Sequence, residues 1–91
     1  MHPSLDLSKL NKNVMTKILV RKVAQCLKTI RKSRDLSQEE LADLSGLDRT
    51  YISGIERGVR NITLDSLESI VSALGMTVDE FLRTLINTDI D

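Results

Sequence analysis

The run from Ser37 to Asn61, SQEELADLSGLDRTYISGIERGVRN, constrains the fold more than any other part of this 91-residue chain. Ser37 and Glu40 have the spacing of a capping box, in which each side chain satisfies a free backbone N–H group at the start of a helix. Gly46 can take the left-handed conformation that ends a helix, and Asp48 can cap the next one. The run therefore predicts two short helices joined by a tight turn.

The second of these helices carries polar and cationic side chains outside its apolar stripe. Ile52 and Ile55 mark the stripe, and the residues that fall mostly outside it are Arg49, Thr50, Tyr51, Ser53 and Arg57. A basic loop follows, which ends with Arg60 and Asn61. A solvated amphipathic helix would explain the polar face alone. The caps, the glycine turn and the basic loop together favour a unit in which one helix crosses a DNA backbone and the next enters the major groove.

Over roughly residues 23–85, the chain resembles the lambda-repressor-like, or Cro/cI-type (XRE), helix-turn-helix family. The segment LDRTYISGIERGVRN is also similar to the small controller proteins of restriction–modification systems. The resemblance implies an all-α, five-helix lambda-repressor-like DNA-binding domain over residues 16–91, with an N-terminal extension of residues 1–15. It also implies a sequence-specific regulator of transcription that binds double-stranded DNA through the major groove.

The resemblance assigns DNA contacts to individual residues. Arg49 and Thr50 match the first positions of the recognition helix, which read base edges, and Ser53 is expected to join them. Contacts to the DNA backbone are expected from Gln38, Tyr51, Arg57, Arg60 and Asn61. Gly54 departs from the pattern, because some family members place a base-reading polar side chain there. A glycine at this position instead allows a close approach of backbone.

Glu56 is an acidic residue near the end of the recognition helix, where it is a poor neighbour for DNA. In the resembling family, this position pairs with an arginine late in the first helix, which aligns with Arg31. We therefore expect an Arg31–Glu56 salt bridge between those two helices. The alternative is an exposed glutamate, whose ion pair would contribute about 0–1 kcal/mol.

The net charge of zero argues at first against a nucleic-acid partner, but the distribution of the charges does not. Residues 1–60 contain 12 Lys and Arg against 7 Asp and Glu, whereas residues 61–91 contain 1 against 6. This asymmetry indicates one face toward a polyanion and another face away from it.

Apolar periodicity predicts three further helices. One runs from about Thr16 to Lys32, and its inner face is expected to hold Leu19, Val23, Leu27 and Ile30. Another is capped by Thr63 and ended by Gly75, and its inward residues are expected to be Leu64, Leu67, Ile70, Val71 and Leu74. The last begins with a second capping box, formed by Thr77 and Glu80. Residues 1–15 fit either an extended arm or a helical stripe.

The apolar residues of the last helix exceed what a short terminal helix needs. No later part of the sequence is expected to cover Phe81, Leu82, Leu85 and Ile86. A partner subunit is the simplest explanation, and in the resembling family the fifth helix commonly serves as a dimer surface. We therefore expect a homodimer that binds a near-palindromic operator.

Other classes of function have few residues in their favour. Cys26 is the only cysteine and His2 the only histidine, so neither a zinc site nor a catalytic set such as Ser-His-Asp is expected. We expect no enzyme activity, cofactor, metal or small-molecule ligand. The N-terminus lacks an apolar signal core and the chain has no apolar run of about 18 residues, so we expect a cytoplasmic protein without a membrane segment. The alternative left open is an antitoxin or inhibitor-type protein-binding module, with DNA binding secondary.

Overall fold

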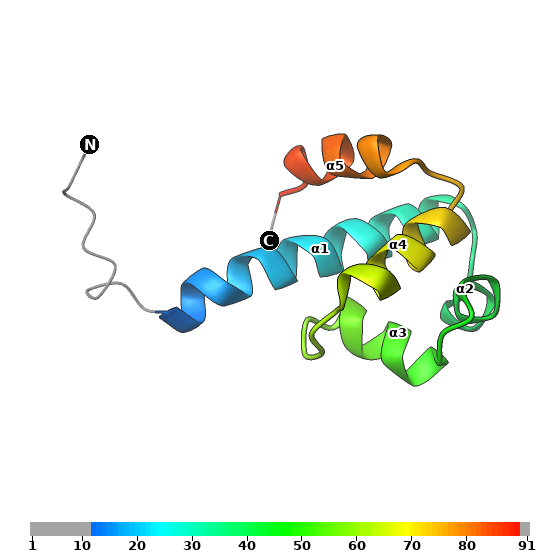
Figure 1. Ribbon diagram of the computed structural model, residues 1–91, viewed down its shortest axis with the longest axis horizontal. Coiled ribbons are helices and arrows are strands. Elements are labelled where there is room, and N and C mark those ends of the chain that lie inside the picture. Colours follow the sequence, from blue (N-terminus) through cyan, green and yellow to red (C-terminus); the bar gives the residue numbers. More distant parts are fainter. Residues whose placement is uncertain (1–11, 90–91) are drawn as a thin grey trace.

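The computed structural model describes residues 12–89, and within that range the chain forms five helices and no strand. The helices are α1 (Lys12–Ser33), α2 (Gln38–Ser45), α3 (Arg49–Glu56), α4 (Leu64–Ala73) and α5 (Val78–Ile86). Figure 1 shows the long helix α1 in the middle of the molecule, with α5 on one side of it and α3 on the other. Helix α2 packs on both α3 and α4, and α5 closes the domain by packing on α1 and α4. The all-α, five-helix architecture predicted from the sequence is confirmed.

The two predicted capping boxes are both present. At the start of α2, the backbone N–H of Glu40 donates to Ser37 Oγ at 2.9 Å, and the backbone N–H of Ser37 donates to Glu40 Oε1 at 2.8 Å. At the start of α5, the backbone N–H of Glu80 donates to Thr77 Oγ1 at 3.1 Å, and the backbone N–H of Thr77 donates to Glu80 Oε1 at 2.8 Å. Both helices are short, so satisfying the free N–H groups of the first turn fixes where each one begins.

The turn between α2 and α3 has the predicted shape, with one difference in its chemistry. Gly46 has a φ of 73°, in the left-handed region, and its N–H donates to the carbonyl of Ala42. Asp48 occupies the cap position of α3 with extended backbone, but its side chain makes no capping hydrogen bond. The predicted position of the cap is correct and the predicted bond is wrong. The start of α3 is therefore held by the turn and by packing rather than by its cap.

The first helix is longer than the sequence pattern predicts. It begins at Lys12 rather than near Thr16, so residues 12–15 of the predicted extension belong to α1, and residues 1–11 lie outside the described residues. The N-terminal part of α1 projects past the other helices (Figure 1). Leu19, which was expected on the inner face, is 61% exposed for this reason. Apolar periodicity identified the helix, but it could not show where the rest of the domain ends.

The hydrophobic core lies between the helices and is almost entirely aliphatic. Its buried residues are Val23, Cys26, Leu27, Ile30, Leu41, Ala42, Ile52, Ile55, Ile70, Val71, Leu74 and Phe81. Leu64, predicted to point inward from α4, is instead 84% exposed, because it is the first residue of that helix and lies beyond the packed part. The remaining inward residues of α4 are buried or packed against the core.

Phe81 requires a correction to the predicted dimer surface. This aromatic side chain is only 1% exposed and belongs to the core, where α5 packs on α1 and α4. Leu85, on the same face of α5, is partly buried against the same core. A side chain that the chain itself covers cannot form a contact with a partner subunit. The apolar surface left exposed on α5 is therefore Leu82 and Ile86, together with Val78 at the start of the helix.

The two capping boxes predict a dependence of stability on pH. Hydrogen bonds from the backbone N–H and then the side chain of the capping residue hold the pKa values of Glu40 and Glu80 below the ordinary value. A lowered folded-state pKa stabilises the protein fully above about pH 4.3, the ordinary value for glutamate, and this stabilisation is lost as the pH falls through the folded-state pKa. Glutamine can form the same box without titrating. We expect the thermal midpoint of Glu40→Gln/Glu80→Gln to fall less on acidification than that of the wild type.

Circular dichroism melting curves between about pH 6 and pH 3 would measure this difference. Glu39→Gln is the matched control, because it removes a neighbouring exposed carboxylate that belongs to neither box. Equal slopes for the double variant and the wild type would contradict the prediction.

Candidate nucleic-acid interface

Helix α3 lies at one edge of the molecule (Figure 1). Its outer face carries polar and cationic residues. Ile52 and Ile55 are buried against the core, and α3 packs on α1 and α2 through that side. Arg49, Thr50 and Arg57 are exposed on the other side, and Ser53 is partly exposed. Residues 49, 53 and 57 are each four apart, so they follow one another along the same face of the helix. The structure thus brings the predicted base-contacting residues together on one open surface.

The loop after α3 adds several of the predicted backbone-contacting residues to this surface. The hydroxyl of Tyr51 donates to the carbonyl of Asn61 at 3.4 Å. The Cζ atom of Arg60 lies 5.4 Å from the centre of the Tyr51 ring, within the range of a cation–π contact. Arg57 Nε donates to the carbonyl of Ser53 at 3.3 Å. The loop therefore lies alongside α3 and extends its polar face.

A buried ion pair connects the recognition helix to α1, as the sequence predicts. Arg31 Nε lies 2.7 Å from Glu56 Oε2, and Arg31 Nη2 lies 2.9 Å from Glu56 Oε1. Both side chains are largely buried. The hydrogen bonds to Glu56 raise the pKa of Arg31 against the opposing effect of burial. A bidentate pair of this kind fixes the orientation of both side chains.

Two further hydrogen bonds complete this cluster. Arg31 Nη1 donates to the carbonyl of Leu36 at 2.7 Å, just before α2. Gln38 Nε2 donates to Glu56 Oε1 at 3.1 Å, so the side chain expected to grip a phosphate is anchored inside the protein. An amide carries two N–H groups, which leaves Gln38 a second donor for a partner. The cluster joins α1, the start of α2 and the end of α3 at a single carboxylate.

Gly54 has a role that sequence reasoning identified only in part. The backbone N–H groups of Val59 and Arg60 donate to the carbonyl of Gly54 at 3.1 and 3.2 Å, which holds the loop against α3 but does not depend on the missing side chain. The space where a Cβ atom would lie, however, is filled by the side-chain stem of Arg60. A glycine on the polar face of a helix, followed by a long side chain in the next loop, was the available signal.

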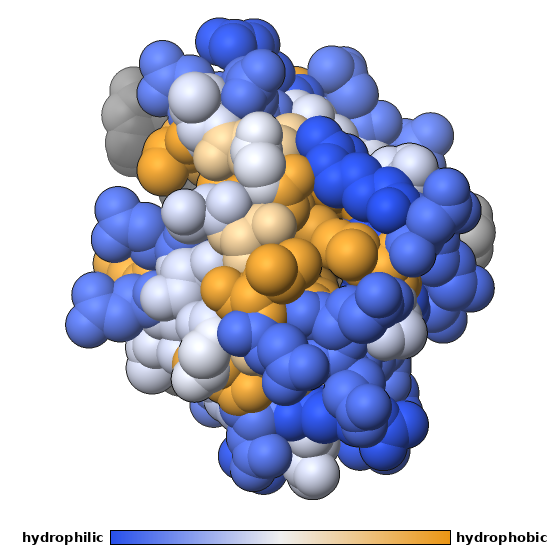
Figure 2. Space-filling model, turned by 90° about the vertical axis from the view of Figure 1, so that its right-hand side faces the viewer, coloured by the Kyte–Doolittle hydropathy of each residue, from blue (hydrophilic) through white to orange (hydrophobic). Residues whose placement is uncertain are grey.

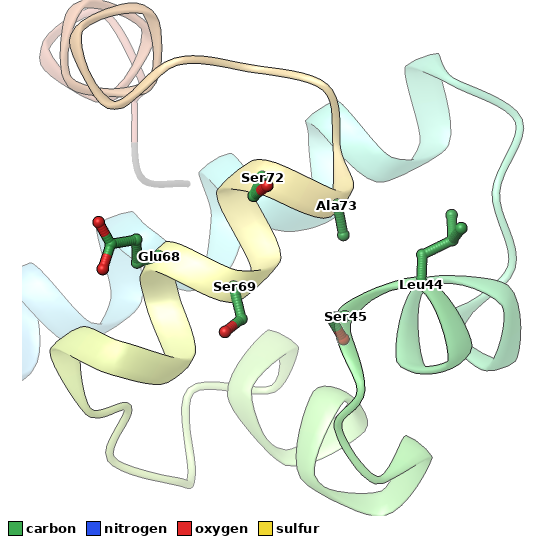
Figure 3. A pocket seen from close by; sticks show the side chains of 6 residues that line it. All are labelled: Leu44, Ser45, Glu68, Ser69, Ser72 and Ala73. Carbon is green, nitrogen blue, oxygen red and sulfur yellow. The ribbon is translucent and has the colours of Figure 1, made fainter.

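The groove in Figure 3 lies between α2 and α4, away from this polar face. It is lined by Leu44 and Ser45 from α2 and by Glu68, Ser69, Ser72 and Ala73 from α4. This lining contains one carboxylate and no cation, so it offers nothing to attract a phosphate. The surface viewed from the α2 side likewise shows apolar side chains in its middle with hydrophilic ones around them (Figure 2). The α3 surface is therefore the better candidate for contact with a polyanion.

The described residues give no support for a metal site, a reactive cysteine or a membrane-spanning helix. Among the described residues, no group of three or more His, Cys, Asp or Glu could hold a metal ion. Burial raises the pKa of the Cys26 thiol, and this effect outweighs the Thr88 hydrogen bond and the Lys22 charge, which lower it. Cys26 is thus a buried core side chain. None of the described helices combines the length and apolarity that crossing a membrane requires.

Comparison with known proteins agrees with this geometry. The model of the family described as Helix-turn-helix matches residues 27–81. The chain belongs to this family. It is 43% identical over 60 residues to control protein C.SmaI of Serratia marcescens, covering 66% of this chain and 71% of the relative. It is 53% identical over 60 residues to control protein C.MunI of Mycoplasma sp, covering 65% and 81%. The resemblance to restriction–modification controller proteins is thereby confirmed.

Solved structures support the same relationship. The wild-type restriction–modification controller protein C.Esp1396I is 48% identical and superposes with a TM-score of 0.74, covering 76% of this chain and 91% of that one. The same protein has been crystallised as a tetramer in complex with its natural 35 base-pair operator, and that structure also gives a TM-score of 0.74.

The burial of the Arg31–Glu56 pair predicts how substitutions at these two positions change the free energy of unfolding. Arg31→Met leaves Glu56 buried without its cation, which we expect to lower the free energy of unfolding by about 3–5 kcal/mol. The double variant Arg31→Met/Glu56→Leu replaces both charges with apolar groups and should recover most of that loss. Urea denaturation followed by circular dichroism would measure both variants.

Arg34→Met is the control, because Arg34 is exposed and its loss should change stability by about 0.5 kcal/mol or less. If the double variant is no more stable than Arg31→Met, the buried unpaired carboxylate is not the cause.

Proposed function

We propose that the protein is a sequence-specific DNA-binding regulator of transcription that acts in the cytoplasm as a homodimer and catalyses no reaction. The observation that carries this proposal is the exposed polar face of α3, held on a domain 48% identical to a controller protein crystallised on its operator. Similarity to control proteins favours a DNA-binding regulator of transcription over the alternative of a protein-binding inhibitor.

The electrostatics of the α3 surface support contact with DNA. A carboxylate at position 56 would repel phosphates if it were free, but two nitrogens of Arg31 and the amide of Gln38 bind its oxygens. Arg49, Arg57 and Arg60 then leave the exposed surface of α3 and its loop positively charged. Such a surface attracts DNA without regard to sequence, and the side chains on α3 would add the discrimination.

We assign the contacts by position on this surface. Arg49, Thr50 and Ser53 lie along the outer face of α3 and would read base edges in the major groove. Gln38 at the start of α2, Tyr51 on α3, and Arg57 and Asn61 near the loop would contact the DNA backbone and fix the register of the helix. The second N–H of the Gln38 amide is suited to this task, because its first N–H is bound to Glu56.

The proposed dimer uses apolar surface on α5. Leu82 is 48% exposed and Ile86 is 73% exposed, and they lie four residues apart on one face of the helix. Beside them, a groove between α4 and α5 is lined by Leu64, Leu67, Glu68, Val71, Val78, Phe81 and Leu82. A two-fold axis through α5 would let the same surface of each subunit cover the other. It would also set the two recognition helices about 34 Å apart, one turn of B-DNA.

The role of Arg49 can be tested by selecting bound DNA from a random pool and then measuring affinities. The planar guanidinium of Arg49 matches the O6 and N7 acceptors of guanine. Arg49→Ala should cost about 1–3 kcal/mol on the selected site and relax the preference at one position in each half-site. Equal losses on the selected site and on random DNA would identify Arg49 as a phosphate contact. No enriched sequence for the wild type would refute the proposed function itself.

The dimer surface can be tested by placing a charge on α5. We expect Leu82→Asp and Ile86→Asp to be folded monomers in sedimentation that bind an operator weakly, because the two half-sites no longer share one association event. Leu44→Asp is the matched control, since Leu44 is an equally apolar side chain, 61% exposed, on α2. It should remain dimeric. If the α5 variants also remain dimeric with full operator affinity, another surface forms the dimer.

A further inference from the structure

Gly54 lies on the outer face of α3 and is nevertheless buried. It is four residues after Thr50 and three before Arg57, and both of these side chains are exposed. On a helix this spacing places the three residues on the same side. An outward glycine is buried only if something from outside the helix covers it. A Cβ atom at position 54 would overlap Cγ of Arg60 and lie 3.3 and 3.5 Å from its Cβ and Cδ.

Arg60 thus fills the space that a side chain at position 54 would occupy. Its backbone is fixed there, because the N–H groups of Val59 and Arg60 both donate to the carbonyl of Gly54. Its guanidinium lies over the ring of Tyr51, with Cζ 5.4 Å from the ring centre. The hydroxyl of Tyr51 in turn donates to the carbonyl of Asn61, the next residue of the loop. The end of the Arg60 side chain is therefore held on the DNA-facing side of α3.

We infer that Arg60 supplies the base-reading side chain that α3 lacks at position 54, with Gly54 and Tyr51 as its positioning residues. This inference rests on the proposed function, and it replaces the backbone contact that the sequence predicts for Arg60. A contact with a phosphate would require only a positive charge near the DNA. It would require neither an absent side chain at position 54 nor a ring under the guanidinium.

The chemistry of arginine fits this role. A guanidinium that rests on an aromatic ring keeps its N–H groups in its own plane, where they can still donate to a partner. The ring restricts the side chain, so less freedom is lost when the N–H groups bind the paired acceptors of a guanine. Lysine carries the same charge but has no planar fork, so it cannot reproduce this arrangement.

The experiment uses the full chain and the operator selected from a random pool, compared with a panel of single-base variants and with random DNA. We expect Arg60→Ala to lose about 5- to 100-fold in affinity for the selected operator and to relax preference at one base pair per half-site. Binding to random DNA should change much less. Arg60→Lys should restore binding to random DNA without restoring the base preference.

Gly54→Ala tests the positioning directly. Alanine favours a helix more than glycine does, but its methyl group meets the stem of Arg60 rather than the end of that side chain, so a circular dichroism melting curve is recorded beside the binding data to show that the variant is folded. Its methyl group would displace Arg60, and we expect the same relaxed base preference as for Arg60→Ala. The double variant Gly54→Ala/Arg60→Ala should lose nothing more. Gly54→Ala/Arg57→Ala is the matched control, in which the two losses should add. Tyr51→Ala, which removes the ring, should relax the same base pair, whereas Tyr51→Phe should keep it.

The outcomes separate this inference from the proposed function. A wild type that enriches no sequence would overturn both. A selective wild type whose Arg60→Ala variant weakens equally on all DNA would make Arg60 a phosphate contact and overturn the inference alone. Unchanged base preference in both Gly54→Ala and Tyr51→Ala would show that neither residue positions Arg60.

Discussion

The ion pair between Arg31 and Glu56 is the interaction on which the orientation of the recognition helix depends. Helix α3 has only 8 residues, too few to persist as an isolated helix in water. Apolar packing of Ile52 and Ile55 holds it on the core, but such packing alone leaves some freedom to rotate or slide. The bidentate bond from α1 removes that freedom, because its two N–H groups match the two carboxylate oxygens in one geometry only. A buried carboxylate is costly without its partner, so the fold and the placement of the recognition surface are linked.

The same cluster explains how an acidic residue can lie next to the proposed DNA-binding surface. Glu56 is the last residue of α3, and its charge is directed inward toward Arg31 and Gln38. Gln38 connects this buried cluster to the surface. It is the first residue of α2, the helix that would cross the DNA backbone, and its side chain binds Glu56. A single group of hydrogen bonds therefore fixes the position of α3 and neutralises the charge of Glu56. The outward residues of α3 are consequently free to vary in sequence without disturbing the way the helix is held.

The features predictable from the sequence are those that depend on a few neighbouring residues. Both capping boxes, the left-handed glycine at 46 and the order of the helices follow from local chemistry, and the structure contains them. The Arg31–Glu56 pair spans 25 residues and came from family resemblance rather than from local chemistry. The errors concern which apolar side chains are covered. Leu19 and Leu64 fit the periodicity of inward residues, but each lies where a helix extends past its neighbours. Periodicity gives the direction of a side chain and not the extent of the surface that meets it.

In helix α5, too, the periodicity of the sequence does not show which apolar side chains are covered. Its apolar sector contains two pairs, Phe81 with Leu85 and Leu82 with Ile86, each four residues apart and therefore each on its own line along the helix. The sequence makes the pairs look equivalent, and only the packing of α5 on α1 and α4 separates them. Phe81 and Leu85 anchor the helix to the core, which leaves Leu82 and Ile86 facing outward on a helix that is already fixed. A partner that binds such a preformed surface does not have to order the helix as it binds, so less of the association free energy is lost to conformational entropy. The residue that proved to be core is thus what makes the neighbouring residues suitable as an interface.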